Sequence, residues 1–529
     1  MLMQHMRSAA RVQRGHPIAR TMTLPAPVGG WNARDAVSEV SAVKTTGQVA
    51  QALRLDNWVP ELGGVRIRRG YSSHATSLSG NYVETLMEYS PGSGTNALFA
   101  ATPTIIYDVT AAAAGTSSLT SLTNGRWSWV NFSTSAGHFL YICNGADTPR
   151  YWNGSTWTNS TFSGSGLTTS NLDFIHVHMN RLWFIEKNTL NIWYAPVSSI
   201  SGTLEKLALG SLCRRGGNVV AMTSWTRDGG SGPEDYIVFI TSKGEVVMYA
   251  GTDPSSITTS ALVGVYKIAE PIGRRCVMQV GADVGVLTSQ GLVSLSASLP
   301  LSEAATGKTA LTDNISGAFR DSFRYYGTNF GWQIIEYPRA GLALVNIPLI
   351  ERTTQYQYVI NTTTGAWCRF TGINAGCWGL LGNELYFGGN GGKVYKYDTG
   401  SKDDGASITA TVQTAFSTFG IPNQKRFSMA RPLFLAPRDY VPQIYFKTDY
   451  DTTALSLSAA LAEDEGVEWD VEDWDDPYWA ANAYPPEAAV PVQNVTGYGV
   501  AGSVLFSVAA QTEVVFNGVD VVFETGGFL

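Results

Sequence analysis

Residues 235–249 read DYIVFITSKGEVVMY, two apolar runs on either side of a short polar turn that contains Gly244. This pattern predicts a β-hairpin. Neither arm alternates between apolar and polar residues, although successive side chains of a strand point to opposite faces of its sheet. Both faces of the hairpin must therefore be covered by other parts of the chain. A hairpin with one solvent-exposed face would instead alternate between apolar and polar residues.

Hairpins of the same kind recur through the middle of the chain. They occupy residues 97–109, 138–154, 181–197, 284–296, 356–370 and 384–400. Marker residues in the second arms recur about every 40 to 50 residues as far as Leu295, a period typical of β-propellers. The inner strands of a propeller blade lie between two neighbouring blades, so both of their faces are buried. We expect six or seven blades over residues 81–400; the alternative is a β-sandwich with many hairpins.

The composition favours an all-β fold. Only 15% of the residues are charged, whereas the chain contains 55 Gly, 15 Trp, 24 Tyr and 21 Phe. Aromatic residues suit pleated strands and Gly suits tight turns. One segment differs, because apolar residues recur every four positions from Leu311 to Phe323. This spacing predicts a single helix over 312–326, inserted between two blades.

The flanks of the predicted propeller carry no blade-like hairpins. Residues 401–529 begin with the alternating strand ASITATVQTAFSTFG, and residues 21–80 contain turn-rich extended segments. We expect a second β domain formed by 401–529, with 21–80 packed on it. Near the C-terminus, SVLFSVAA and VVFNGVDVVFETGG are expected to pair, with Asn517 and Gly518 as a turn.

Residues 1–20 are interpreted as an N-terminal extension. They contain four Arg and no apolar stretch of the kind found in a secretory signal. No apolar run approaches the roughly 18 residues of a membrane-spanning helix, so no membrane insertion is expected. The five Cys form no CxxC pair and are expected to be buried thiols in a reducing cell rather than disulfides or zinc ligands.

Candidates for catalysis are few, and we expect no enzymatic activity, cofactor or metal. His176 and His178 would share one face of a strand, as metal ligands can, but no third ligand lies near them, which favours a structural role. No G-x-S-x-G elbow, P-loop or H-E-x-x-H sequence occurs. The paired carboxylates of a glycoside hydrolase could still converge from distant positions.

Three arginine pairs stand out in this charge-poor chain, each beside a Gly. They are Arg68 with Arg69, Arg214 with Arg215, and Arg274 with Arg275. Each pair is expected to form salt bridges at a strand end or part of a subunit interface, rather than to bind DNA. The net charge of −7 also argues against tight binding of nucleic acid by the whole surface.

Acidic residues are concentrated in one segment of the C-terminal region. Residues 463–476, EDEGVEWDVEDWDD, contain nine carboxylates and no basic residue. These are Glu463, Asp464, Glu465, Glu468, Asp470, Glu472, Asp473, Asp475 and Asp476. We expect an exposed acidic loop of the second domain, which either is merely solvated or faces a DNA channel or a basic partner.

Several segments resemble the tail nozzle proteins of short-tailed bacteriophages, a family that includes tail tubular protein B and the packaged-DNA stabilisation proteins. Among them are GGWNARDAV, LDNWVP, IRRGYSSHAT, NGADTPRYWNG, LWFIEKNTLNIWYAPV, the run from TRDGGSGPED to PIGRRC, and the terminal VVFNGVDVVFETGG. Apart from that terminal segment, the resemblance covers roughly residues 25–400.

The resemblance implies a virion protein, made in the host cytoplasm and assembled into the short tail. It implies a six-fold ring of identical chains that lies under an adaptor ring, holds fibres or spikes, and encloses the channel through which double-stranded DNA leaves. Two alternatives remain. One is a receptor- or glycan-binding propeller, in which Trp127 with Trp129 or Trp152 with Trp157 would stack on sugar rings. The other is a propeller enzyme that degrades glycans.

Overall fold

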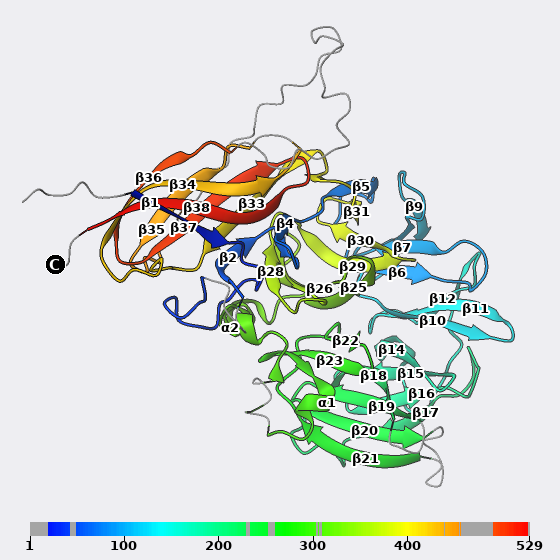
Figure 1. The fold of residues 1–529 in the computed structure, drawn as a ribbon. Coiled ribbons are helices and arrows are strands. Elements are labelled where there is room, and N and C mark those ends of the chain that lie inside the picture. Colours follow the sequence, from blue (N-terminus) through cyan, green and yellow to red (C-terminus); the bar gives the residue numbers. More distant parts are fainter. Residues whose placement is uncertain are drawn as a thin grey trace, which may run out of the picture.

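The computed structural model describes residues 19–42, 49–228, 233–251, 260–302, 305, 309–437, 440–453, 455 and 490–526. The acidic segment 463–476 and the first 18 residues lie outside the described residues. Within the described part the fold is all-β. Seven antiparallel blades form a propeller, and a further domain of strands from both ends of the chain lies beside it (Figure 1). The last two blades and strands of that domain belong to one 13-stranded sheet.

The first four blades are four-stranded meanders in chain order. Blade 1 consists of β6 (Thr85–Tyr89), β7 (Ala97–Ala101), β8 (Ile106–Asp108) and β9 (Thr116–Leu119), and blade 2 of β10 (Ser128–Thr134), β11 (Gly137–Cys143), β12 (Arg150–Trp152) and β13 (Trp157–Asn159). Blade 3 consists of β14 (Leu172–His178), β15 (Arg181–Glu186), β16 (Asn191–Tyr194) and β17 (Glu205–Ala208), and blade 4 of β18 (Val219–Asp228), β19 (Pro233–Thr241), β20 (Glu245–Gly251) and β21 (Ser260–Lys267).

The last three blades depart from this pattern. Blade 5 has three strands in the described residues, and blade 7 takes its outermost strand from the N-terminal region. Blade 5 consists of β22 (Val277–Val280), β23 (Asp283–Thr288) and β24 (Gly291–Ser294). Blade 6 consists of β25 (Gln333–Tyr337), β26 (Leu342–Ile350), β27 (Thr354–Asn361) and β28 (Trp367–Phe370), and blade 7 of β29 (Ala375–Leu381), β30 (Glu384–Gly389), β31 (Val394–Tyr397) and β5 (Tyr71–Ala75). The ring closes where β29 packs against β6.

The hairpin β19–β20 explains the non-alternating sequence of residues 235–249. These strands are the two middle strands of blade 4, paired in register so that Phe239 faces Val247 across the ladder. Phe239 and Val247 belong to a core shared with blade 3, whereas Val238 and Val246 belong to the core that includes blade 5. Burial on both faces confirms the prediction of inner blade strands.

Helices are short in the described part of the chain. The predicted helix is confirmed as the 3-10 turn η3 (Asp313–Ile315) followed by α2 (Ser316–Tyr326), which connects blades 5 and 6 and buries Ile315 and Phe319. The others are α1 (Leu295–Ser298), η1 (Thr169–Asn171) and η4 (Pro338–Ala340). None of the helices could cross a membrane, as judged over the described residues.

The second domain, here called the terminal domain, combines strands from both ends of the chain. One sheet has the order β3-β4-β38-β34-β36, with β1 also paired to β38; the other contains β2, β33, β37 and β35, and β32 joins β33 to β5. These strands are β1 (Ala19–Pro25), β2 (Ala52–Asp56), β3 (Trp58–Pro60), β4 (Val65–Ile67), β32 (Lys402–Asp403), β33 (Ala406–Thr414), β34 (Lys425–Leu435), β35 (Gln443–Thr448), β36 (Gln493–Gly499), β37 (Gly502–Ala510) and β38 (Val515–Thr525).

The core of the terminal domain is aromatic. Trp58 from the N-terminal region is fully buried, with ring centroids 6.2 Å from Phe434, 6.3 Å from Phe506 and 6.1 Å from Phe516. A residue near the start of the chain thus fills the space between strands that lie near its end. The N-terminal strands therefore belong to the core of the domain rather than to its surface.

The predicted turn at Asn517 and Gly518 is wrong. Both residues lie inside β38, which pairs with β34, β4 and β1 but not with β37. The β38–β34 register shifts at Asn517, which marks a bulge. A Cβ on Gly518 would lie 2.8 Å from the carbonyl oxygen of Leu24, so Gly is needed here because β1 passes closely. The Asn-Gly signal is local, and pairing with distant strands overrides it.

Candidate functional site: the propeller axis and the interdomain joint

A cavity of about 500 Å³ follows the propeller axis. Its lining comes from the innermost strand of every blade, namely β6, β10, β14, β18, β22, β25 and β29. Polar side chains such as His176, Gln279 and Gln333 alternate around it with apolar ones such as Met222 and Trp378. This axial cavity is the hollow that seven blades leave when they close into a ring.

Arg274 and Arg275, just before β22, lie at one end of the axial cavity. Arg274 donates through Nη1 to the carbonyl (2.7 Å) and the carboxylate of Asp173 in blade 3. Arg275 donates through Nη2 to the carbonyl oxygen of Glu84 at 2.9 Å and to Thr85 Oγ1 at 2.7 Å, both in blade 1. The pair therefore fastens blade 5 to blades that lie across the axis.

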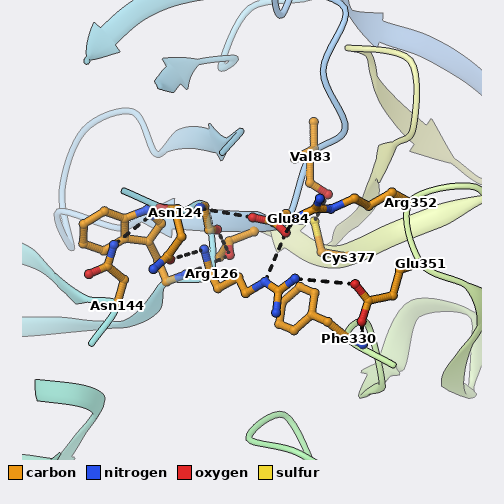
Figure 2. A network of polar contacts seen from close by, with 12 residues as sticks. Val83, Glu84, Asn124, Arg126, Asn144, Phe330, Glu351, Arg352 and Cys377 are labelled. Carbon is orange, nitrogen blue, oxygen red and sulfur yellow. Dashed lines mark hydrogen bonds and ion pairs between the residues drawn. The ribbon is translucent and has the colours of Figure 1, made fainter. Parts of the chain in front are cut away.

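A second cavity, of about 320 Å³, adjoins the same arginine pair. Figure 2 shows the network beside it, in which Arg126 lies between Glu84 and Glu351. The nitrogen–oxygen distances are 3.2 Å to Glu84 and 3.6 Å to Glu351. Glu84 is buried and also pairs with Arg352 at 3.1 Å. We call this second space the arginine cavity.

Phe330 fixes two of the guanidinium groups in place. The ring centroid is 4.0 Å from the guanidinium carbon of Arg126 and 5.3 Å from that of Arg275. Burial lowers the pKa of Arg275 to about 10. Burial also raises the pKa of Asp173, although the neighbouring charge of Arg274 opposes this. Electrostatic interactions are therefore strong at this end of the axis.

Sequence reasoning singled out Arg274 and Arg275 but missed their partners. Glu84, Arg126, Phe330 and Glu351 come from three different blades and are far apart in the chain. The only local signal is a charged residue directly before or after an apolar strand, which is too common to identify a site.

The two histidines lie on β14 and share one partner. His176 Nε2 is 3.0 Å, and His178 Nδ1 is 2.8 Å, from Ser224 Oγ on the neighbouring blade. Burial lowers the pKa of His176 to about 4, so the ring is neutral at pH 7. In the part of the chain that the structure describes, no group of three His, Cys, Asp or Glu residues is arranged to hold a metal ion.

Arg68 lies at the joint between the propeller and the terminal domain. Its side chain is fully buried and pairs with both carboxylate oxygens of Asp403, at 2.8 and 2.5 Å. It also donates to Asn57 Oδ1 at 2.9 Å and to the carbonyl oxygen of Thr371 at 3.1 Å. The guanidinium thus joins the N-terminal strands, blade 6 and the chain that leaves blade 7, and it is enclosed within a single subunit.

The other arginines of the three pairs differ in exposure. Arg69 is 43% exposed and pairs with Asp398 and Glu513. Arg214 and Arg215 are exposed, and their backbone amides both donate to the carboxylate of Glu245 at 3.0 Å. Arg69, Arg214 and Arg215 are thus the exposed members of the six, available for contact with another subunit.

Three of the four tryptophans considered as sugar platforms pack against neighbouring strands of the propeller, whereas Trp129 is half-buried and lines the axial cavity. Trp127 is 2% exposed. The ring centroids of Trp152 and Trp157 are 5.5 Å apart, and both lie edge-on to Phe99 of blade 1. Trp157 also donates through Nε1 to Ser118 Oγ at 2.9 Å. The five cysteines are free and buried, as expected.

No protein-family model matches this chain, and no curated protein matches it in sequence. Among solved structures, it is similar to the N-terminal part of BBS1 in complex with ARL6 (10% identity, 63% of this chain and 97% of that chain covered, TM-score 0.39). It is also similar to Sqt1 of Saccharomyces cerevisiae (12% identity, 65% of this chain and 96% of that chain covered, TM-score 0.36). A third similar structure is YCF48 bound to a D1 peptide (10% identity, 66% of this chain and 98% of that chain covered, TM-score 0.36). The propeller assignment rests on the strand order described above.

Proposed function

We propose that this chain is a structural subunit of a short bacteriophage tail, a nozzle component that assembles into a ring around the DNA channel and helps to retain packaged DNA. The observation that carries the proposal is where the phage-like segments lie in the fold. Four of them, GGWNARDAV, LDNWVP, IRRGYSSHAT and PIGRRC, supply contacts that join the propeller to the terminal domain or close the propeller axis.

The first three segments act at the joint. The backbone amide of Trp31 in GGWNARDAV donates to the carbonyl oxygen of Trp367 in blade 6 at 2.7 Å. Asp56 of LDNWVP pairs with Arg369 of blade 6, and Arg68 of IRRGYSSHAT pairs with Asp403. These contacts hold the propeller and the terminal domain together as one unit, which suits a structural subunit.

The proposed partners follow from the resemblance. They are further copies of this chain in a ring of six, an adaptor ring, tail fibres or spikes, and double-stranded DNA in transit, all within the virion. The net charge of −7 supports a conduit rather than a DNA-gripping protein, because each Lys or Arg that neutralises a phosphate adds salt-dependent affinity.

Electron microscopy of the purified full-length protein, with native mass spectrometry, tests the ring. We expect six-fold rings, alone or when the adaptor ring of the same phage is added, and labelling of the tail by an antibody against this chain. A protein that stays monomeric with the adaptor and is absent from virions would overturn the proposal. Glycan-array binding by the monomer would favour the receptor-binding alternative, and release of reducing ends from a glycan would favour the enzyme.

The acidic segment offers a second test, based on sequence alone. If residues 463–476 face the channel, their carboxylates repel phosphates over about a Debye length, ~8 Å at physiological salt. Replacing Asp470, Glu472, Asp473, Asp475 and Asp476 with Asn or Gln should then slow DNA ejection, most strongly at low salt. Ejection at the parental rate at every salt concentration would show that the segment has no channel or docking role.

A further inference from the structure

We propose that Asn153 is a site of spontaneous covalent modification, at which the side-chain amide is lost and an aspartate or isoaspartate forms. This site goes beyond the proposed function and does not depend on it. Asn153 precedes Gly154 in the turn between β12 and β13 of blade 2, and both residues are exposed. Gly favours the reaction because it has no Cβ, so its amide nitrogen can approach the neighbouring side chain.

The reaction consumes only water. The amide nitrogen of Gly154 forms a bond to Cγ of Asn153, the Cγ–Nδ2 bond breaks, and Nδ2 leaves as ammonia with the proton of the Gly154 amide. Water then opens the cyclic imide at either of its carbonyl groups, which yields aspartate or isoaspartate. The fold controls the rate through the attacking amide, the carbonyl group that it attacks and the leaving amide.

All of these groups are suitably placed at Asn153. Among the described residues, the Gly154 amide has no acceptor and Nδ2 of Asn153 forms no hydrogen bond. Oδ1 of Asn153 accepts from the backbone amides of Ser155 at 3.0 Å and Thr156 at 2.9 Å, and from Ser155 Oγ at 3.0 Å. Negative charge develops on Oδ1 during the attack, so these donors stabilise the intermediate as an oxyanion hole does.

Four other Asn-Gly pairs occur in the chain, and two of them have an engaged nucleophile. The buried amide of Gly145 donates to the carbonyl oxygen of Leu172 at 2.8 Å, and Nδ2 of Asn144 is also engaged, with Asp147 at 2.7 Å. At Asn124, the buried amide of the following glycine donates to the carboxylate of Glu84 at 3.2 Å. These amides must give up a hydrogen bond before they can lose a proton and attack.

The remaining two pairs fail for other reasons. Nδ2 of Asn390 donates to the carbonyl oxygen of Thr353 at 3.0 Å and to Gln355 Oε1 at 2.9 Å, while its Oδ1 is buried and has no donor among the described residues. Asn517 lies inside β38, where Gly518 is paired with both β34 and β1. The extended backbone there cannot bend into an imide ring without breaking these ladders.

Modification would alter a turn that holds two tryptophans together. Residues 153–156 connect Trp152 and Trp157, which face each other across the β12–β13 ladder with ring centroids 5.5 Å apart. An isoaspartate routes the backbone through the side-chain carbon and so lengthens the turn by one methylene, and either product adds a negative charge. We therefore expect the modified protein to melt at a lower temperature than the parent.

Peptide mapping of the full-length protein by mass spectrometry tests the proposal. The protein is kept in mildly alkaline buffer, folded or in urea, and samples are digested at acidic pH after increasing times. In the folded protein, Asn153 should convert about tenfold or more faster than Asn144 and Asn124. In urea these sites should react at similar rates, because the fold no longer distinguishes them.

Two variants test the chemistry at this position. Ser155→Ala removes one donor to Oδ1 and should slow the conversion, whereas Asn153→Gln has a longer side chain that disfavours ring closure and should stop it. Isoaspartyl methyltransferase labelling distinguishes isoaspartate from aspartate in each sample.

An unmodified Asn153 in the folded protein would overturn the proposal, and so would equal conversion of Asn153 and Asn144 there. Faster conversion of Asn153 in urea than in the folded protein would also overturn it, since the turn would then protect the site rather than activate it.

Discussion

Asp56 and Arg369 form a two-point ion pair across the joint between the terminal domain and blade 6, with nitrogen–oxygen distances of 2.7 and 2.8 Å. The Asp56 side chain is 4% exposed and also accepts from Arg54 at 2.6 Å. Burial by itself would lower the pKa of Arg369, but the charge and hydrogen bonds of Asp56 raise it above its ordinary value. The pair links the parallel strands β2 and β28 at the one position where they are paired.

We predict that Asp56→Ala destabilises the protein by roughly 3 kcal/mol, because it leaves Arg369 in a largely buried place without a counter-charge. Urea unfolding followed by fluorescence measures this. The control is Arg431→Ala, which breaks the more exposed pair with Asp520 (2.9 Å, Arg431 44% exposed) and should cost less than about 1 kcal/mol. Equal effects of the two variants would contradict a stabilising role of the Asp56–Arg369 pair.

Gly70 is predicted to tolerate no side chain. A Cβ at this position would lie 2.0 Å from the carbonyl oxygen of Lys402, so the backbone of one segment would have to move. Gly70→Ala should lower the free energy of unfolding by about 1–3 kcal/mol, the range for overpacking. Gly63→Ala, where no atom lies within 4 Å of the added Cβ, is the matched control and should change stability little. Thermal melting compares the two variants.

Phe239→Asp is predicted to prevent folding. Phe239 has no exposed surface and contacts Trp183 of the neighbouring blade at a centroid distance of 5.9 Å. An unpaired carboxylate there would cost several kcal/mol or more. The control is Val263→Asp on β21, where the native side chain is 42% exposed. A soluble Phe239→Asp protein that melts cooperatively would count against the assignment of β19 as an inner strand.

Stability should depend on His176 between pH 6.5 and 4. Because burial lowers its pKa from 6.5 to about 4, the unfolded chain binds a proton more readily than the native state in this range. The stabilisation is therefore complete above pH 6.5 and is lost as the pH falls toward 4, by ~3 kcal/mol at most. The difference in unfolding free energy between the parent and His176→Gln should shrink over this interval. Parallel pH profiles would contradict the prediction.

The sequence by itself determined the class of fold and the burial of the middle strands of blade 4 on both of their faces. Apolar runs without alternation, such as Ile237–Ile240, are compatible only with strands covered on both faces, and their recurrence required a repeated unit. The helix at 316–326 was equally readable, because its four-residue spacing is a local property of the chain. These features depend on patterns within some ten residues, which hydrophobic burial enforces wherever the segment lies.

The tertiary structure alone decided how distant segments meet. Asn517 and Gly518 carry a turn signal, yet β38 continues through them with only a bulge, because β34 and β1 supply partners along its length. Likewise β5 closes blade 7, and Arg275 reaches Glu84 across the propeller axis. Such pairings depend on ring closure, which brings residues nearly two hundred positions apart into contact, and no local pattern in the sequence encodes that distance.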